Sequence, residues 1–234
     1  MPVFIPPGVK AFPSLAYVSE EGVLAVGGDM TRDMLERAYR VGIFPWYDKT
    51  TPPLWWSPPT RCMLRPEEMH IPRSLRRVIN ARRFSLTLDT AFSDVMARCA
   101  AVHEAVQGGT WIMPEMLGAY ADLHAAGLAH SIEAWQDGVL VGGLYGVSLG
   151  RAFFGESMFF SVPDASKVAF VWLGSLLRAW GFTLIDCQQV TDNLLRFGAY
   201  PVSRDRFMAL LADALTQPDM LGPWRMPDGF FPLN

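Results

Sequence analysis

Apolar residues at helical spacing, followed by apolar residues at strand spacing, dominate the middle of the chain. Helical periodicity covers 74–81, 91–105 and the stretch from Pro114 to Gly127. Three strand-like stretches follow, at 128–135, 139–148 and 151–159. Only Asp137-Gly138 and a turn at Gly150 separate them, and turns this short join antiparallel neighbours. We therefore predict a three-stranded antiparallel meander.

A long helix and a further strand come after the meander. Apolar positions from Val168 to Ala179 share one helical face, and Gly181 ends that helix. The strand 182–188 follows, then a short helix after Thr191 and a last helix from Ser203. This mixed α/β order, with a mixed sheet and flanking helices, resembles the acetyltransferase-like (GNAT-like) fold. In that fold a donor binds where two central strands part.

The first 62 residues differ from the rest and predict a small N-terminal α+β domain, followed by a catalytic domain over 63–234. They are rich in Pro and Gly and contain one helix, which Thr31 caps and Gly42 ends. Large aromatic residues follow that helix in irregular chain, among them Trp46, Trp55 and Trp56. They are either the core of the small domain or a stacking wall for a base or an apolar side chain.

Polar residues at the end of the strand 182–188 are the best candidates for chemistry. Side chains alternate along a strand, so Asp186 and Gln188 share one face and Cys187 has the other. A carboxylate beside a carboxamide can hold and polarise an amine, although strand ends of this kind also cap helices. Glu156 stands in an apolar strand beside Phe154, and it can meet Asp186 only if the two strands are neighbours.

Charge is unevenly distributed along the chain. The net charge is −3, yet the segment 61–83 holds seven arginines and two glutamates, a net charge of +5 that leaves −8 elsewhere. Such a segment is either a solvated helix face or a surface that binds phosphates, and its few acids favour the second. The arginines are Arg61, Arg65, Arg73, Arg76, Arg77, Arg82 and Arg83.

Composition limits the remaining possibilities. Half of the residues are hydrophobic, which is enough for a large core, but no stretch has the uninterrupted apolar length of a membrane span. Cys62, Cys99 and Cys187 are odd in number and widely spaced, which indicates a reducing, cytoplasmic setting without structural disulfides. The four histidines have no metal-ligand spacing. We expect no metal and no cofactor, and the loop 160–164 lacks the glycines that would cradle coenzyme A.

Several short motifs, in one order over nearly the whole chain, resemble the leucyl/phenylalanyl-tRNA–protein transferase family. No single motif is specific, but together they are. They are the runs 22–29 (GVLAVGGD), 38–46 (AYRVGIFPW), 54–58 (LWWSP), 109–112 (GTWI), 130–133 (HSIE), 141–147 (VGGLYGV), 154–159 (FGESMF), 165–167 (ASK) and 184–188 (LIDCQ).

The resemblance implies a reaction and a set of site residues. Leu, Phe or Met would move from aminoacyl-tRNA to the N-terminal amine of a protein that begins with Arg or Lys, marking that protein for N-end-rule degradation. Asp186, Gln188 and Glu156 would handle the amine and the cationic acceptor. The donor side chain would bind among Trp46, Trp111, Phe153, Leu173, Leu177 and Ile185. Leu173 and Leu177 stand where family members can carry Phe, so the preference between Leu and Phe donors stays open.

The role of each site residue also stays open. Asp186 either accepts a proton from the amine or only positions it, and the ribose hydroxyl beside the ester is another proton carrier. Rival activities are a coenzyme A-dependent acetyltransferase, a peptidoglycan-type aminoacyl-tRNA transferase and a non-catalytic RNA-binding module. We expect a monomer, because no long apolar helix face remains without a partner.

Overall fold

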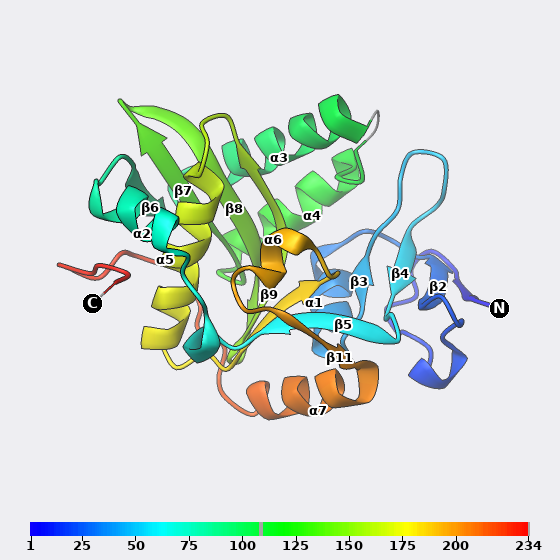
Figure 1. The fold of residues 1–234 in the computed structure, drawn as a ribbon. Helices are drawn as coiled ribbons and strands as arrows, with labels where there is room; N and C mark the ends of the chain where they lie inside the picture. The colour runs from blue at the N-terminus through cyan, green and yellow to red at the C-terminus, as the bar shows by residue number, and fades with distance from the viewer. Residues whose placement is uncertain (108–109, 234) are drawn as a thin grey trace.

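The centre of the protein is a seven-stranded mixed sheet, shown in Figure 1. The computed structural model describes residues 1–107 and 110–233, so Gly109, the first residue of one motif, lies outside them. The strand order is β11-β5-β10-β9-β8-β7-β6. Every neighbouring pair is antiparallel except β9 and β10, which are parallel. The strands are β5 (Thr60–Leu64), β6 (Ser85–Leu88), β7 (Ala129–Gln136), β8 (Val139–Leu149), β9 (Ala152–Phe160), β10 (Leu184–Gln188) and β11 (Tyr200–Ser203).

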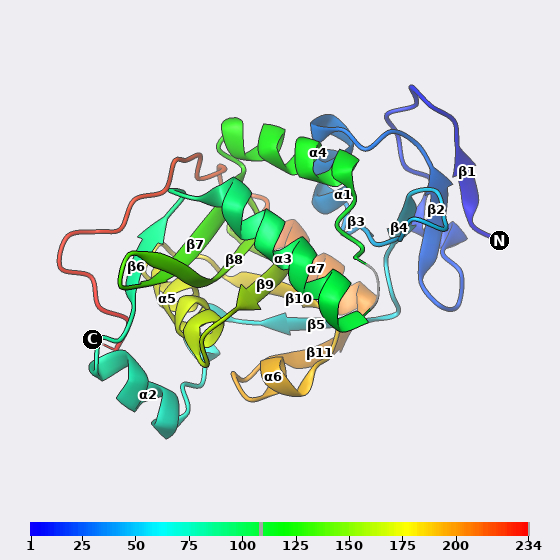
Figure 2. The same cartoon turned by 90° about the horizontal axis from the view of Figure 1, so that it is seen from above.

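Helices cover both faces of this sheet (Figure 2). Helix α5 packs on one face of β7, β8 and β9, and α3 packs on the other face with α4 beside it. The helices are α2 (Arg73–Asn80), α3 (Phe92–Gln107), α4 (Pro114–Ala125), α5 (Ala165–Ala179), α6 (Asp192–Leu195) and α7 (Arg204–Ala214). The predicted meander and the mixed α/β class are therefore confirmed. Among the described residues, no helix combines the length and apolarity needed to cross a membrane.

The N-terminal part of the chain forms a second, four-stranded sheet with the order β1-β2-β4-β3. Its elements are β1 (Val3–Ile5), β2 (Val23–Gly27), α1 (Arg32–Arg40), β3 (Phe44–Pro45) and β4 (Leu54–Trp56), with a short 3-10 helix at Leu15–Tyr17. A second 3-10 helix, Pro66–Glu68, follows β5 and packs against α5. Helix α1 packs against α4, so this sheet and the large one share one buried core. The next strand, β5, already belongs to the large sheet.

Two irregularities sit next to each other in the central strands. Strand β10 pairs with β9 only from Leu184 to Asp186. Beyond Asp186 the two strands are no longer hydrogen-bonded to each other as a sheet. On β9, a bulge opposite β8 makes Glu156 the extra residue between Gly155 and Ser157. On β10, a bulge opposite β5 makes Cys187 the extra residue, and Gln188 takes the left-handed conformation with φ of 59°. Bulges redirect side chains, and here they turn polar groups into the gap between the strands.

Candidate active site

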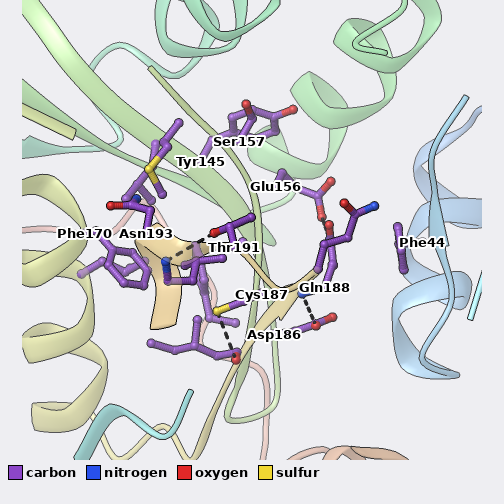
Figure 3. Close-up of a pocket in the computed structure, with 18 of the residues that line it drawn as sticks. Phe44, Tyr145, Glu156, Ser157, Phe170, Asp186, Cys187, Gln188, Thr191 and Asn193 are labelled. Carbon is purple, nitrogen blue, oxygen red and sulfur yellow. Dashed lines mark hydrogen bonds between the residues drawn. The ribbon is translucent and has the colours of Figure 1, made fainter. Parts of the chain in front are cut away.

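A cavity of about 400 Å³ opens where β9 and β10 part (Figure 3). Helix α5, α6 and the aromatic segment after α1 complete its walls. Eight of the nine residues expected to handle donor or acceptor line it: Trp46, Trp111, Phe153, Glu156, Leu173, Ile185, Asp186 and Gln188. The ninth, Leu177, is buried one turn further along α5, in the core beneath that helix, and does not line the cavity.

The inner wall of the cavity is apolar. Phe153, Leu173 and Ile185 are buried there and project from β9, α5 and β10. Sequence reasoning missed four further apolar residues of this wall, which are Leu144, Met158, Phe170 and Leu194. Their spacing is that of ordinary core positions, so no local signal distinguishes them. The cavity therefore suits an aliphatic or aromatic apolar side chain.

The N-terminal aromatic residues were expected to be either core or a wall of a binding site, and both roles occur. Trp55 is fully buried in the core, with its indole N–H donating to the carbonyl of Gly27 at 2.9 Å. Trp46 is 40% exposed, lines the cavity and packs against the ring of Trp56 with centroids 5.5 Å apart. The first is thus core and the second is a wall of the cavity.

Glu156 is at the centre of a hydrogen-bond network. Tyr39 and Tyr120 donate to its two carboxylate oxygens at 2.6 and 2.8 Å, and Gln188 Nε2 donates to Oε1 at 3.0 Å. The two tyrosine hydroxyls also contact each other. Three oxygen–oxygen contacts with two phenolic protons leave one contact without a proton unless Glu156 carries one. A proton on Glu156 would complete this set of hydrogen bonds, so the network accommodates the protonated form as well as the carboxylate.

Burial shifts Glu156 toward its protonated form. Desolvation raises its pKa from 4.5 to about 7, against the lowering effect of the hydrogen bonds from Tyr39 and Tyr120, while the charge of Asp186 adds to the rise. Burial raises the pKa of both tyrosines well above the usual value, so they remain protonated donors. Glu156 can therefore both hold and release a proton near neutral pH.

Asp186 has a different environment, although its strand neighbours that of Glu156. Arg61 donates from Nε to Oδ1 at 2.8 Å and from Nη2 to Oδ2 at 2.6 Å, and both side chains are buried. The backbone N–H of Gln188 also donates to Oδ1, at 2.9 Å. The guanidinium lies between the rings of Phe44 and Phe207, 4.5 and 4.6 Å from their centroids. Asp186 is therefore a fixed, charge-balanced anchor for Gln188.

Arg61 was expected to contact tRNA phosphates, and this expectation was wrong. It is 1% exposed, because β5 lies inside the sheet and turns this side chain toward Asp186 on β10. A cation among the apolar residues Cys62, Met63 and Leu64 was the signal for a buried ion pair.

The other arginines of that segment do lie at the surface or near it. Arg73, Arg76, Arg77, Arg82 and Arg83 are exposed on α2 and the turn after it, while Arg65 is half-buried and pairs with Glu67 at 3.3 Å. Arg82 also stacks over the ring of Phe231, 5.5 Å from its centroid.

Sequence reasoning missed the two tyrosines. Tyr39 is on α1 and Tyr120 on α4, both on helix faces that are otherwise apolar and fully buried. A tyrosine at such a position needs a partner for its hydroxyl, which was the available signal. Tyr39 also shows that the N-terminal part of the chain contributes directly to the site. Among the described residues, no cluster of three or more His, Cys, Asp or Glu could hold a metal ion.

The site as a whole defines a class of enzyme. An apolar cavity ends at a carboxylate that titrates near neutrality and at a fixed carboxamide. This arrangement suits the transfer of an apolar acyl group to an amine, because it holds the acyl side chain and can take up a proton.

Family comparisons identify the particular enzyme class. The family model described as leucyl/phenylalanyl-tRNA protein transferase matches residues 63–212, and that of its N-terminal domain matches 28–59. Relatives named leucyl/phenylalanyl-tRNA–protein transferase include one from Nitratidesulfovibrio vulgaris, 54% identical over 97% of both chains. Another, from Anaeromyxobacter dehalogenans, is 52% identical over 97% of both. The chain belongs to this family of aminoacyltransferases, whose substrates are aminoacyl-tRNA and a protein acceptor.

Two solved structures superpose only loosely on this chain. An aminoglycoside acetyltransferase from a soil metagenome has a TM-score of 0.39 at 13% identity, over 50% of this chain and 86% of the other. The structure of L-PGS from Bacillus licheniformis has a TM-score of 0.40 at 12% identity, over 69% and 50%. Scores this low establish no shared fold.

Proposed function

We propose that the protein transfers Leu, Phe or Met from aminoacyl-tRNA to the N-terminal amine of proteins that begin with Arg or Lys, and so marks them for N-end-rule degradation. The observation that carries this proposal is the apolar cavity that ends at Glu156 and Gln188. The parting of parallel strands β9 and β10 at the cavity supports a GNAT-like catalytic fold.

The cavity favours the proposed donors by shape. Its walls at Phe153, Leu173 and Ile185 offer only apolar contact to a side chain. One methylene in such a pocket is worth about 1–3 kcal/mol of discrimination. Leu, Phe and Met can fill the space, whereas Val leaves part of it empty and should react more slowly.

The acidic residues favour a cationic acceptor. Glu156 is partly accessible from the cavity, and Asp186 lies behind Gln188. Because Arg61 balances the charge of Asp186, the carboxylate available to an incoming cation is that of Glu156. An N-terminal amine with an Arg or Lys side chain brings positive charge to this point.

The proposed reaction needs no covalent enzyme intermediate, since the donor ester is already activated. The amine nitrogen attacks the ester carbonyl, the bond from carbonyl carbon to ribose oxygen breaks, the amine loses one proton and the ribose oxygen gains one. Gln188, fixed through its backbone by Asp186, orients the amine, and Glu156 accepts its proton. The neighbouring ribose hydroxyl is an alternative carrier for that proton.

The exposed arginines supply a surface for the tRNA. Arg73, Arg76, Arg77, Arg82 and Arg83 lie along α2 and the turn after it, with Arg65 near by in the chain. Contacts of this kind to phosphates position a nucleic acid without reading its sequence. Binding should therefore weaken with salt and depend little on tRNA sequence.

A transfer assay tests the proposal. Purified protein is mixed with labelled Leu-tRNA and a peptide that begins with Arg, beside a matched peptide that begins with Ala and a reaction with labelled acetyl-coenzyme A. We expect leucine on the Arg peptide alone. Acetyl transfer without leucine transfer would overturn the proposal, and leucine on both peptides would refute the acceptor preference.

A further inference from the structure

Cys62 and Cys187 are neighbours on the face of β5 and β10 that lies opposite the Arg61–Asp186 pair. Arg61 faces Asp186, so the next residue of β5, Cys62, faces the other way. Both cysteines pack in the core cluster on that side, and the Cys187 thiol donates a weak hydrogen bond to the carbonyl of Ile185 at 4.0 Å. The proposed transfer mechanism uses neither thiol.

The backbone geometry at this point suits a disulfide. Strands β5 and β10 are antiparallel, and Cys62 is in register with Gln188, the residue directly after Cys187. Opposed residues in an antiparallel pair have Cα atoms about 4.5–5.5 Å apart. Disulfides span about 4.4–6.8 Å between Cα atoms, so a bond across this bulge needs only a local shift.

The two thiols differ in how they can be reached. Cys62 is fully buried and does not line the cavity. Cys187 is half-buried and lines the cavity, where its side chain lies on the opposite side of the strand end from Asp186 and Gln188 (Figure 3). A small oxidant that enters the donor cavity therefore meets Cys187 first.

We propose that Cys62 and Cys187 form an oxidation site, at which a peroxide converts the two thiols into a disulfide that reversibly stops transfer. The inference rests on the proposed function, because it assigns a control to the same cavity. Disulfides formed in reducing compartments are usually transient and redox-sensing.

The chemistry balances with hydrogen peroxide as the oxidant. The Cys187 sulfur attacks one peroxide oxygen, the O–O bond breaks, and Cys187 sulfenic acid and one water form. The Cys62 thiolate then attacks the Cys187 sulfur, the S–OH bond breaks, and the hydroxide leaves as a second water. The two thiols together give two electrons to the peroxide. The neighbouring Cys62 thiol and burial raise the pKa of the Cys187 thiol well above its ordinary value, so the first step needs excess peroxide and an alkaline pH.

A disulfide here would act on the catalytic residue beside it. Cys187 is the extra residue of the bulge that gives Gln188 its left-handed backbone and its bond to Glu156. Drawing the Cys187 sulfur toward β5 changes the bulge, and with it the direction of the Gln188 side chain. The amine then loses its orienting carboxamide.

The test uses the full-length protein treated with excess hydrogen peroxide at a pH above neutrality. Peptide mapping under non-reducing conditions identifies any linked cysteines, and transfer is measured before treatment, after it, and after dithiothreitol. Dithiothreitol does not reverse methionine oxidation, so recovery isolates the disulfide. The matched control is Cys62→Ala, outside the cavity, with Cys62→Ser as a second variant if Ala destabilises the core.

We expect a Cys62–Cys187 link, loss of transfer, recovery with dithiothreitol, and a buried Cys99 that remains a thiol. Untreated Cys62→Ala should transfer at the rate of the untreated wild type. Peroxide should cause no loss of its activity that dithiothreitol can reverse. A protein that forms no such link, or one that forms it and transfers unchanged, would overturn the proposal. If the untreated protein transfers nothing, the proposed function fails, and the mapped link alone then decides the oxidation site.

Discussion

Glu156 and Asp186 lie on neighbouring strands at one cavity, yet their surroundings give them different properties. Asp186 accepts two hydrogen bonds from Arg61 and one from the backbone of Gln188, which hold its side chain in one orientation. Glu156 has neutral donors from Tyr39, Tyr120 and Gln188, and burial raises its pKa to about 7. The partner of a buried carboxylate, more than its position, decides whether it holds structure or moves protons.

The largest expected effect comes from removing the titrating carboxylate. Glu156→Gln keeps the size of the side chain but cannot accept a proton at neutral pH. We expect the transfer rate to fall by roughly 10²–10⁴-fold, the usual contribution of general base catalysis. Single-turnover transfer to an Arg peptide measures it, with exposed Glu20→Gln as the control. A loss below tenfold would assign the proton to another carrier, such as the ribose hydroxyl.

Asp186, which is paired with Arg61, should contribute mainly to the stability of the fold. Arg61→Met leaves Asp186 buried without a cation, and breaking such a pair costs about 3–5 kcal/mol. Denaturant unfolding measures this loss. Exposed Arg76→Met is the control, and a surface change of that kind should stay within about 0.5 kcal/mol. Equal stabilities for the two variants would show that Asp186 does not depend on Arg61.

A smaller effect separates the cavity wall from the core behind it. Leu173 and Leu177 are both buried on α5, but only Leu173 lines the cavity. Leu173→Val should enlarge the pocket by one methylene and shift donor choice toward Phe by roughly tenfold. Leu177→Val should cost similar stability and leave the ratio of Phe to Leu transfer unchanged. A shift in both variants would mean that α5 moves as a whole.

A smaller change still should follow the loss of one tyrosine hydroxyl. Tyr39 donates to Glu156 and so lowers its pKa, which means that Tyr39→Phe should raise the pKa of Glu156 further. One hydrogen bond to a buried group is worth about 0.5–1.5 kcal/mol. We expect the pH profile of transfer to move to more alkaline values, with exposed Tyr17→Phe unchanged. An acid shift would contradict the network.

The smallest effect concerns single arginines on α2. Each phosphate contact contributes about −0.9 to the slope of log affinity against log salt. Arg76→Ala should therefore make that slope shallower by about one, measured by tRNA binding at several salt concentrations. Exposed Arg37→Ala, outside the arginine segment, should leave it unchanged. An unchanged slope for both variants would show that Arg76 does not contact a tRNA phosphate.

Much of this arrangement was predictable from local sequence. The meander and α5 follow from periodicity and from turn residues such as Gly138 and Gly150, because local rules determine them. Three strands of the large sheet were missed. The edge strands β6 and β11 are short, and Pro201 interrupts the second. The internal strand β5 was interpreted as the start of the basic segment.

The site was predictable only in part, since its properties depend on contacts between distant segments. The polar residues Asp186, Gln188 and Glu156 were found because each stands out in an apolar strand. Arg61 was placed at the surface because a basic segment was read as a unit, although its strand is buried. Tyr39 joins Glu156 across 117 positions of sequence, and no local pattern reports such a contact.

The pH dependence of single-turnover transfer tests the central claim, that Glu156 is the group that accepts the proton. In the wild type, the rate should rise through an apparent pKa of about 7, besides the rise due to the acceptor amine. Glu156→Gln should keep only the rise due to the amine. If the variant shows the same two rises as the wild type, Glu156 does not accept the proton and the account is wrong.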